Sequence, residues 1–103
     1  MLEKTSHTPP YIVVFKLLSG EEIIVTVKNI LSTAYEIKNP LMMVMGQRGP
    51  QFAPFMIMDN PTKSITLYKS SIMAGVLPTP ELESQYESIV SGIALPQKSS
   101  IIT

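Results

Sequence analysis

A chain of 103 residues has room for one domain with a single core. Eight basic and eight acidic residues give a formal charge of zero, and the chain has no cysteine and one histidine, His7. Without cysteine the chain can form no disulfide and no thiolate metal site, and a single histidine nearly excludes a histidine-based metal site. No cofactor is therefore expected. Hydrophobic residues make up 45% of the chain, more than a small domain easily hides alone, and self-association is the simplest remedy.

The N-terminal residues 1–10 are polar and end in Pro9-Pro10, so they are predicted to form a tail and not a signal peptide. The longest apolar runs fall far short of the roughly 18 residues that a membrane span needs. The absence of cysteine is typical of a reducing compartment. We therefore expect a cytoplasmic protein without membrane contact.

Residues 11–18 and 22–28 alternate in the manner of two strands, and Ser19-Gly20 between them predicts a hairpin turn. The apolar face of this hairpin is predicted to consist of Tyr11, Val13, Phe15, Leu17, Ile23, Val25 and Val27.

The middle of the chain predicts further strands. Residues 35–41 alternate, and Pro40 lacks a ladder donor, which favours a bulge or a sheet edge there. The strand continues to Met45, residues 46–50 form a loop, and residues 52–58 return before a turn at 59–61. Two short strands are expected at 64–69 and 72–77.

One helix is well marked after Pro78. Thr79 can cap it, Pro80 suits its first position, and Glu81 and Glu83 favour its first turn. We expect a β domain over 11–78, a helix over 79–94 and a tail over 95–103. Five or six strands are too few for a sandwich and favour a strongly bent open barrel. The apolar stripe of the helix is predicted to be Leu82, Tyr86, Ile89, Val90 and Ile93.

No pattern of catalytic residues emerges, so the chain is not expected to be an enzyme. His7 lies in the tail, and Glu21 and Glu22 point to opposite faces of a strand. Asp59 has an ordinary role in a turn. The glycines at 46 and 49 precede no helix, which excludes a phosphate-binding glycine loop.

Three features allow two interpretations each. The methionines are either flexible core filler or an adaptable contact surface. Arg48, the only arginine, is either a solvated loop charge or a phosphate contact. Lys69, beside Ser70-Ser71, is either an ordinary strand-end lysine or a contact to phosphate or a base edge. The methionines in question are Met42, Met43, Met45, Met56 and Met58.

Residues 67–72, Leu-Tyr-Lys-Ser-Ser-Ile, followed by Val-Leu-Pro at 76–78, resemble the second signature segment of the Sm-like (Hfq-type) family. Ser70 stands where the Hfq-type pattern has histidine. The first signature segment, a strand, a Leu-x-x-Gly turn and a strand, is similar to residues 13–27, and Asn39 is the candidate for the asparagine that follows. The hairpin and the C-terminal helix look like those of Sm-like proteins from marine tailed phages.

The resemblance implies a mainly β fold: a small, strongly bent, five-stranded antiparallel barrel with an extended β-hairpin and one C-terminal helix. It also implies a homo-oligomeric ring of five to seven subunits, closed by edge strands, that binds single-stranded RNA or DNA in the cytoplasm, which is the host cytoplasm for a phage protein. It places either Tyr35 or Ile37 where a base would stack. Including Arg48, the candidate nucleic-acid-binding residues are Tyr35, Ile37, Asn39, Arg48, Lys69 and Ser70.

Two functions follow as hypotheses. The first is a ring-forming module that binds single-stranded nucleic acid, RNA foremost, favoured by Tyr68-Lys69 and Asn39. The second is an oligomeric scaffold that has kept the ring without the nucleic-acid site. Zero net charge, the missing histidine and the methionines favour the second.

Overall fold

The computed structural model describes residues 8–55 and 64–94, with side chains up to Ser91. The expectations for residues 1–7, 56–63 and 95–103, including His7, Met56, Met58 and Asp59, lie outside the described residues, as does the side chain of Ile93. A 3₁₀ turn, Lys69–Ser71, separates the last two strands. The elements are β1 (Tyr11–Leu17), β2 (Glu22–Ile30), β3 (Ala34–Gly46), β4 (Gly49–Pro54), β5 (Ile65–Tyr68), β6 (Ile72–Val76) and α1 (Pro80–Ala94).

All described strands belong to one antiparallel sheet in the order β4-β3-β2-β1-β6, and β5 pairs with β3 beside this path. The expected mainly β fold with one helix is confirmed. The sheet has six strands, within the expected five or six, and β4, which pairs with β3, is the additional strand of the extended hairpin. Within the described residues the sheet is not closed, since β5 and β6 do not pair with each other.

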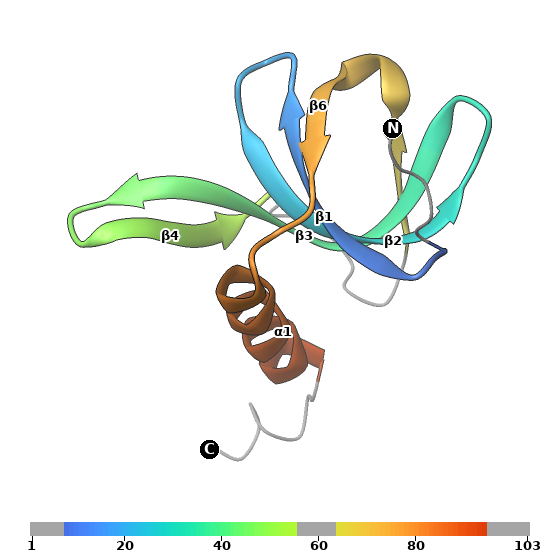
Figure 1. Cartoon of the computed structure of the whole chain (residues 1–103). Helices are drawn as coiled ribbons and strands as arrows, with labels where there is room; N and C mark the ends of the chain where they lie inside the picture. Colours follow the sequence, from blue (N-terminus) through green and yellow to red (C-terminus); the bar gives the residue numbers. More distant parts are fainter. Residues whose placement is uncertain (1–7, 56–63, 95–103) are drawn as a thin grey trace.

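Both predicted hairpins are present. Gly20 adopts φ +110° in the turn between β1 and β2, and its N–H donates to the carbonyl of Leu17 at 2.9 Å. The β3–β4 hairpin extends away from the rest of the molecule (Figure 1). Its return strand begins at Gly49, earlier than the expected Phe52, because Gly46 and Gly49 pair and leave only Gln47-Arg48 as a turn.

A bulge divides β3 into two halves. Ile24 pairs with Leu41 and Thr26 with Lys38, so two steps along β2 oppose three along β3. The extra residue lies next to Asn39, whose φ is +53°. Of the two alternatives predicted from Pro40, a bulge or a sheet edge, the structure shows the bulge. An extra residue reverses the alternation of side chains, so Ile37 and Leu41 face opposite sides of the sheet.

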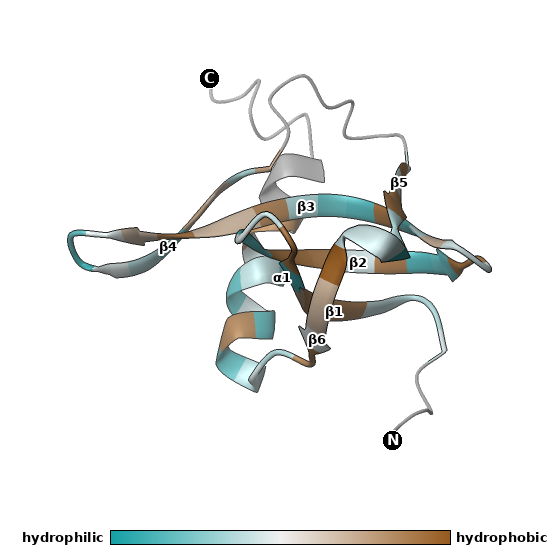
Figure 2. Cartoon of the chain, turned by 90° about the horizontal axis from the view of Figure 1, so that it is seen from above, coloured by the Kyte–Doolittle hydropathy of each residue, from teal (hydrophilic) through white to brown (hydrophobic). Residues whose placement is uncertain are grey.

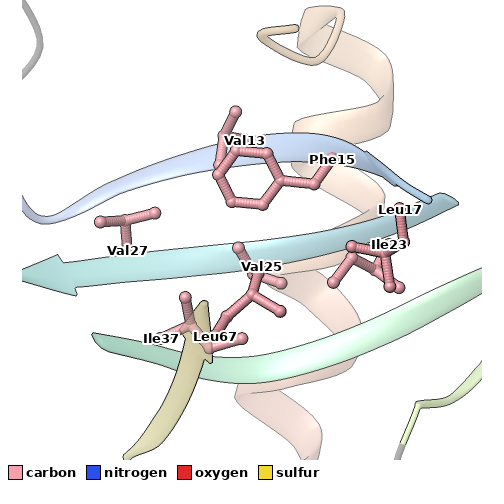
Figure 3. Close-up of a cluster of buried hydrophobic side chains, with 8 residues drawn as sticks. All are labelled: Val13, Phe15, Leu17, Ile23, Val25, Val27, Ile37 and Leu67. Carbon is pink, nitrogen blue, oxygen red and sulfur yellow. The ribbon is translucent and has the colours of Figure 1, made fainter. Parts of the chain in front are cut away.

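The sheet has a core on each face. The interior core lies within the bend of the strands, and Figure 3 shows its buried side chains. The helix-side core joins Val14, Ile24 and Leu41 to Tyr86 of α1. The expected apolar face of the first hairpin accounts for only one of its two buried faces, because α1 covers the other face. The interior core comprises Val13, Phe15, Leu17, Ile23, Val25, Val27, Ile37 and Leu67.

The helix begins as predicted. The Leu82 N–H donates to the Thr79 hydroxyl at 3.2 Å, which caps the first turn. Tyr86 is 1% exposed, and Leu82 and Val90 pack partly buried beside it. Ile89, expected on the same stripe, is 37% exposed instead. Figure 2 shows the mixed hydropathy of this helix next to the sheet. The helix therefore contacts the sheet through side chains spaced four residues apart, namely Leu82, Tyr86 and Val90.

Candidate nucleic-acid interface

The pairing of β5 with β3 brings the two halves of the candidate interface together. Ala34 pairs with Tyr68 and Tyr35 with Leu67, so the chain leaves β5 beside the start of β3. The Lys69 N–H donates to the Thr33 carbonyl at 3.0 Å and extends this contact into the 3₁₀ turn. The Lys69 ammonium then lies over the Tyr35 ring, 5.2 Å from its centroid.

Core packing supports the Tyr35 ring. Its centroid lies 5.2 Å from that of Phe15, and the two planes are tilted by 34°. Tyr11 packs against the same interior core. Burial is the main cause that raises the pKa of Tyr11, and electrostatic interaction with Tyr35 adds a smaller contribution. Tyr35 itself is half-buried. A half-buried ring held by the core and covered by a cation is a favourable platform for cation–π contact.

Ser70 is exposed beside Lys69 in the 3₁₀ turn. Its neighbour Ser71 closes the turn, because its hydroxyl donates to the Tyr68 carbonyl at 2.7 Å. The Tyr68 side chain is 60% exposed. The turn therefore presents an ammonium, a hydroxyl and a phenol ring on a short stretch of chain, and one of its two serines has a structural role.

Ile37 is corrected as a candidate. It was expected as an alternative to Tyr35 for stacking against a base, but it is 0% exposed and belongs to the interior core. A side chain with no accessible surface offers no platform to a ligand. Of the two residues, only Tyr35 has exposed surface.

Asn39 and Arg48 occupy other parts of the fold. Asn39 lies in the β3 bulge, beyond the end of the β3–β5 ladder, and its carbonyl accepts a hydrogen bond from the Tyr86 hydroxyl at 2.9 Å. Arg48 is exposed at the tip of the β3–β4 hairpin. The structure thus joins Tyr35, Lys69 and Ser70 and leaves these two candidates apart from them.

Two further residues escaped the sequence analysis. Thr33 contacts the Lys69 backbone across a sequence separation that no local pattern reveals. Tyr86 was assigned to the apolar stripe of the helix, whereas its hydroxyl reaches Thr26 Oγ1 at 2.9 Å as well as the bulge. Burial raises the pKa of Tyr86 to about 12, against a smaller opposing effect of its hydrogen bond with Thr26. A tyrosine on an otherwise aliphatic stripe was the available signal, because a buried phenol needs partners.

The acidic pair after the first turn has local partners. The Ser19 hydroxyl donates to Glu21, and this bond is the main reason that the pKa of Glu21 is lowered. Glu22 lies 3.6 Å from the Lys16 ammonium. In the described ranges, no three His, Cys, Asp or Glu side chains come together in a way that could hold a metal ion.

No helix in the described part of the chain has the length and apolar character needed to cross a membrane. Comparison with protein-family models gives no match, and comparison with curated proteins gives none either.

Proposed function

We propose that this chain assembles into a ring and binds single-stranded nucleic acid, RNA foremost, next to Tyr35 and Lys69. The observation that carries the proposal is the Lys69 ammonium 5.2 Å from the Tyr35 centroid, with the exposed Ser70 beside it. Single-stranded nucleic acids bind where aromatic rings meet cations, because bases stack on the rings while phosphates pair with the charge. One such site on a neutral chain is weak, and a ring multiplies it.

The strand order supports the assembly. The path β5-β3-β2-β1-β6 contains five antiparallel strands, as the Sm-like resemblance implies, and in the described chain each of its two end strands has one ladder only. Along β6, Met73 is 59% and Val76 64% exposed. Pairing between β5 of one copy and β6 of the next would cover these edges and close the barrel-like sheet into a ring.

Nucleic-acid binding is tested by titrating labelled U-rich RNA, A-rich RNA and single-stranded DNA at two salt concentrations. We expect binding that weakens with salt and an affinity that Lys69→Ala reduces about tenfold, a loss of about 1.4 kcal/mol. Lys16→Ala is the matched control. It removes the same charge from β1 at a position that faces away from Phe15 and the Tyr35 ring, and it should bind like the wild type.

The assembly is tested separately by light scattering. The wild type should have the mass of five to seven copies, and Val76→Lys, which places a charge on the β6 edge, should lower that mass. A ring that binds none of the oligomers at low salt would overturn the nucleic-acid part of the proposal. A monomeric wild type would overturn the ring.

The alternative function is an oligomeric scaffold that binds no nucleic acid. The observation that favours it is the β3–β4 hairpin, where Met45 is 79% exposed on an arm that lies apart from the Lys69 turn. An exposed apolar side chain on an extended arm is typical of protein contact. The titration above separates the two functions.

A further inference from the structure

A groove lies between α1 and the first two strands, away from the Lys69 turn. Its volume is about 680 Å³. Apolar side chains of Ile12, Leu77 and Val90 line it, and Glu83 and Glu87, one helical turn apart, add two carboxylates. No ion pair to either carboxylate forms within the described residues. The groove therefore combines an apolar lining with two carboxylates that no cation of residues 8–55 or 64–91 neutralises.

The tip of the β3–β4 hairpin has the complementary chemistry. Met45 is the most exposed of the large apolar side chains in the described chain, at 79%, and Arg48 is exposed in the turn that follows. Arg48 is the only arginine of the sequence and forms no ion pair within residues 8–55 and 64–94. The paired Gly46 and Gly49 keep the tip slender, because neither carries a side chain.

We propose that the groove receives the hairpin tip of a second copy of the chain, with the Arg48 guanidinium between Glu83 and Glu87 and with Met45 against the apolar lining. The hairpin leaves the body of its own molecule (Figure 1), so its tip meets the groove of another copy. Charge complementarity selects this occupant, because a guanidinium binds carboxylates in a fixed geometry. The inference rests on the self-association in the proposed function, but it uses neither the β5 nor the β6 edge.

Because the sequence contains no cysteine, single cysteines can report the contact. Gln47→Cys on the tip is mixed with Ser91→Cys, an exposed position that lines the groove. The matched control is Ser88→Cys, which is exposed on the same helix outside the groove lining. On mild oxidation, the 47–91 disulfide should form at least about tenfold faster than the 47–88 disulfide, because docking raises the local thiol concentration. Equal rates would overturn the proposal.

Charge reversal then tests the recognition. Arg48→Glu in the first partner should reduce the 47–91 rate to the control level, as should Glu83→Lys with Glu87→Lys in the second partner, and combining both sets should restore it. No loss on reversal, or no recovery on combination, overturns the contact. If the terminal residues of the chain itself fill the groove, the 47–91 disulfide should form no faster than the 47–88 disulfide. That result would also overturn the proposal.

The same experiment in the Val76→Lys background separates this contact from the ring. A faster 47–91 disulfide in a chain that no longer assembles supports the hairpin contact and shows that it is independent of the strand edges. An intact ring with equal 47–91 and 47–88 rates refutes the hairpin contact and leaves the proposed function standing.

Discussion

The Tyr86 hydroxyl lies 2.9 Å from the carbonyl oxygen of Asn39 and so joins the C-terminal helix to the bulge in β3. The same hydroxyl lies 3.4 Å from the carbonyl oxygen of Lys38 and 2.9 Å from Thr26 Oγ1 on the neighbouring strand. A bulge leaves backbone groups without ladder partners. One phenol group therefore satisfies polar atoms that the irregular strand exposes under the helix.

Tyr86→Phe should lower the free energy of unfolding by about 1–2 kcal/mol, because it leaves the half-buried Asn39 carbonyl and Thr26 hydroxyl without this partner. Urea denaturation followed by circular dichroism measures the change. Tyr68→Phe removes the same atom from a side chain that is 60% exposed and should change stability by less than about 0.5 kcal/mol. Equal effects of the two variants would contradict the role given to the Tyr86 hydroxyl.

Stability should fall at high pH for the same reason. The pKa of Tyr86 is about 12 in the folded chain and about 10 in an unfolded one. The contribution of Tyr86 is therefore complete below pH 10 and is lost as the pH rises from 10 towards 12, by up to about 3 kcal/mol. Unfolding free energies measured across this range should decline more steeply in the wild type than in Tyr86→Phe, and parallel curves would refute the assignment.

Substitutions of Asn39 can distinguish a role in backbone conformation from a role in nucleic-acid binding. Its φ of +53° is costly for most side chains, so Asn39→Ala should destabilise the fold by about 1 kcal/mol, whereas Asn39→Gly should be nearly neutral. Thermal denaturation gives both values. If the role of Asn39 is conformational, Asn39→Gly also binds RNA like the wild type. A glycine variant that folds normally and loses RNA binding would instead return Asn39 to the nucleic-acid site.

Ile37 should behave as a core residue. Because it is 0% exposed, Ile37→Ala removes buried methyl groups and leaves a cavity, at a cost of about 2–5 kcal/mol in unfolding free energy. Ile30→Ala, at a position that is 47% exposed at the end of β2, should cost less than about 1 kcal/mol. Chemical denaturation of the pair checks this, and similar losses in both would contradict the assignment of Ile37 to the core.

Local patterns predicted most of the elements, because each has a local cause. Alternation identified the strands, Thr79 and Pro80 identified the start of the helix, and Pro40 identified the bulge. Pairing across the chain was not predictable in this way. The return of β5 to the first half of β3 depends on contacts between residues about thirty positions apart, and these contacts place Tyr35 beside Lys69.

The missed burial has a related cause. Alternation in the first hairpin indicated one apolar face, and Val14 and Ile24 on the other face were not assigned to a core. Both are buried because α1 crosses that face. The sequence pattern of a strand shows which of its side chains are apolar. It does not show which other helix or strand packs against them. For the same reason the pattern of β3 does not reveal that Ile37 is buried, because the side chains that cover it come from β1, β2 and β5.

The extra residue of β3 makes the alternation of side chains in the β3–β4 hairpin arm independent of the alternation in the first half of β3. Two residues added to each strand of the hairpin beyond Leu41 would lengthen the arm by about 7 Å and leave every interior side chain in its place. Removing one residue beside Asn39 would instead turn Leu41 away from Tyr86 and into the interior. The fold therefore tolerates changes in the length of the arm, whereas it requires a constant spacing from Ile37 to Leu41.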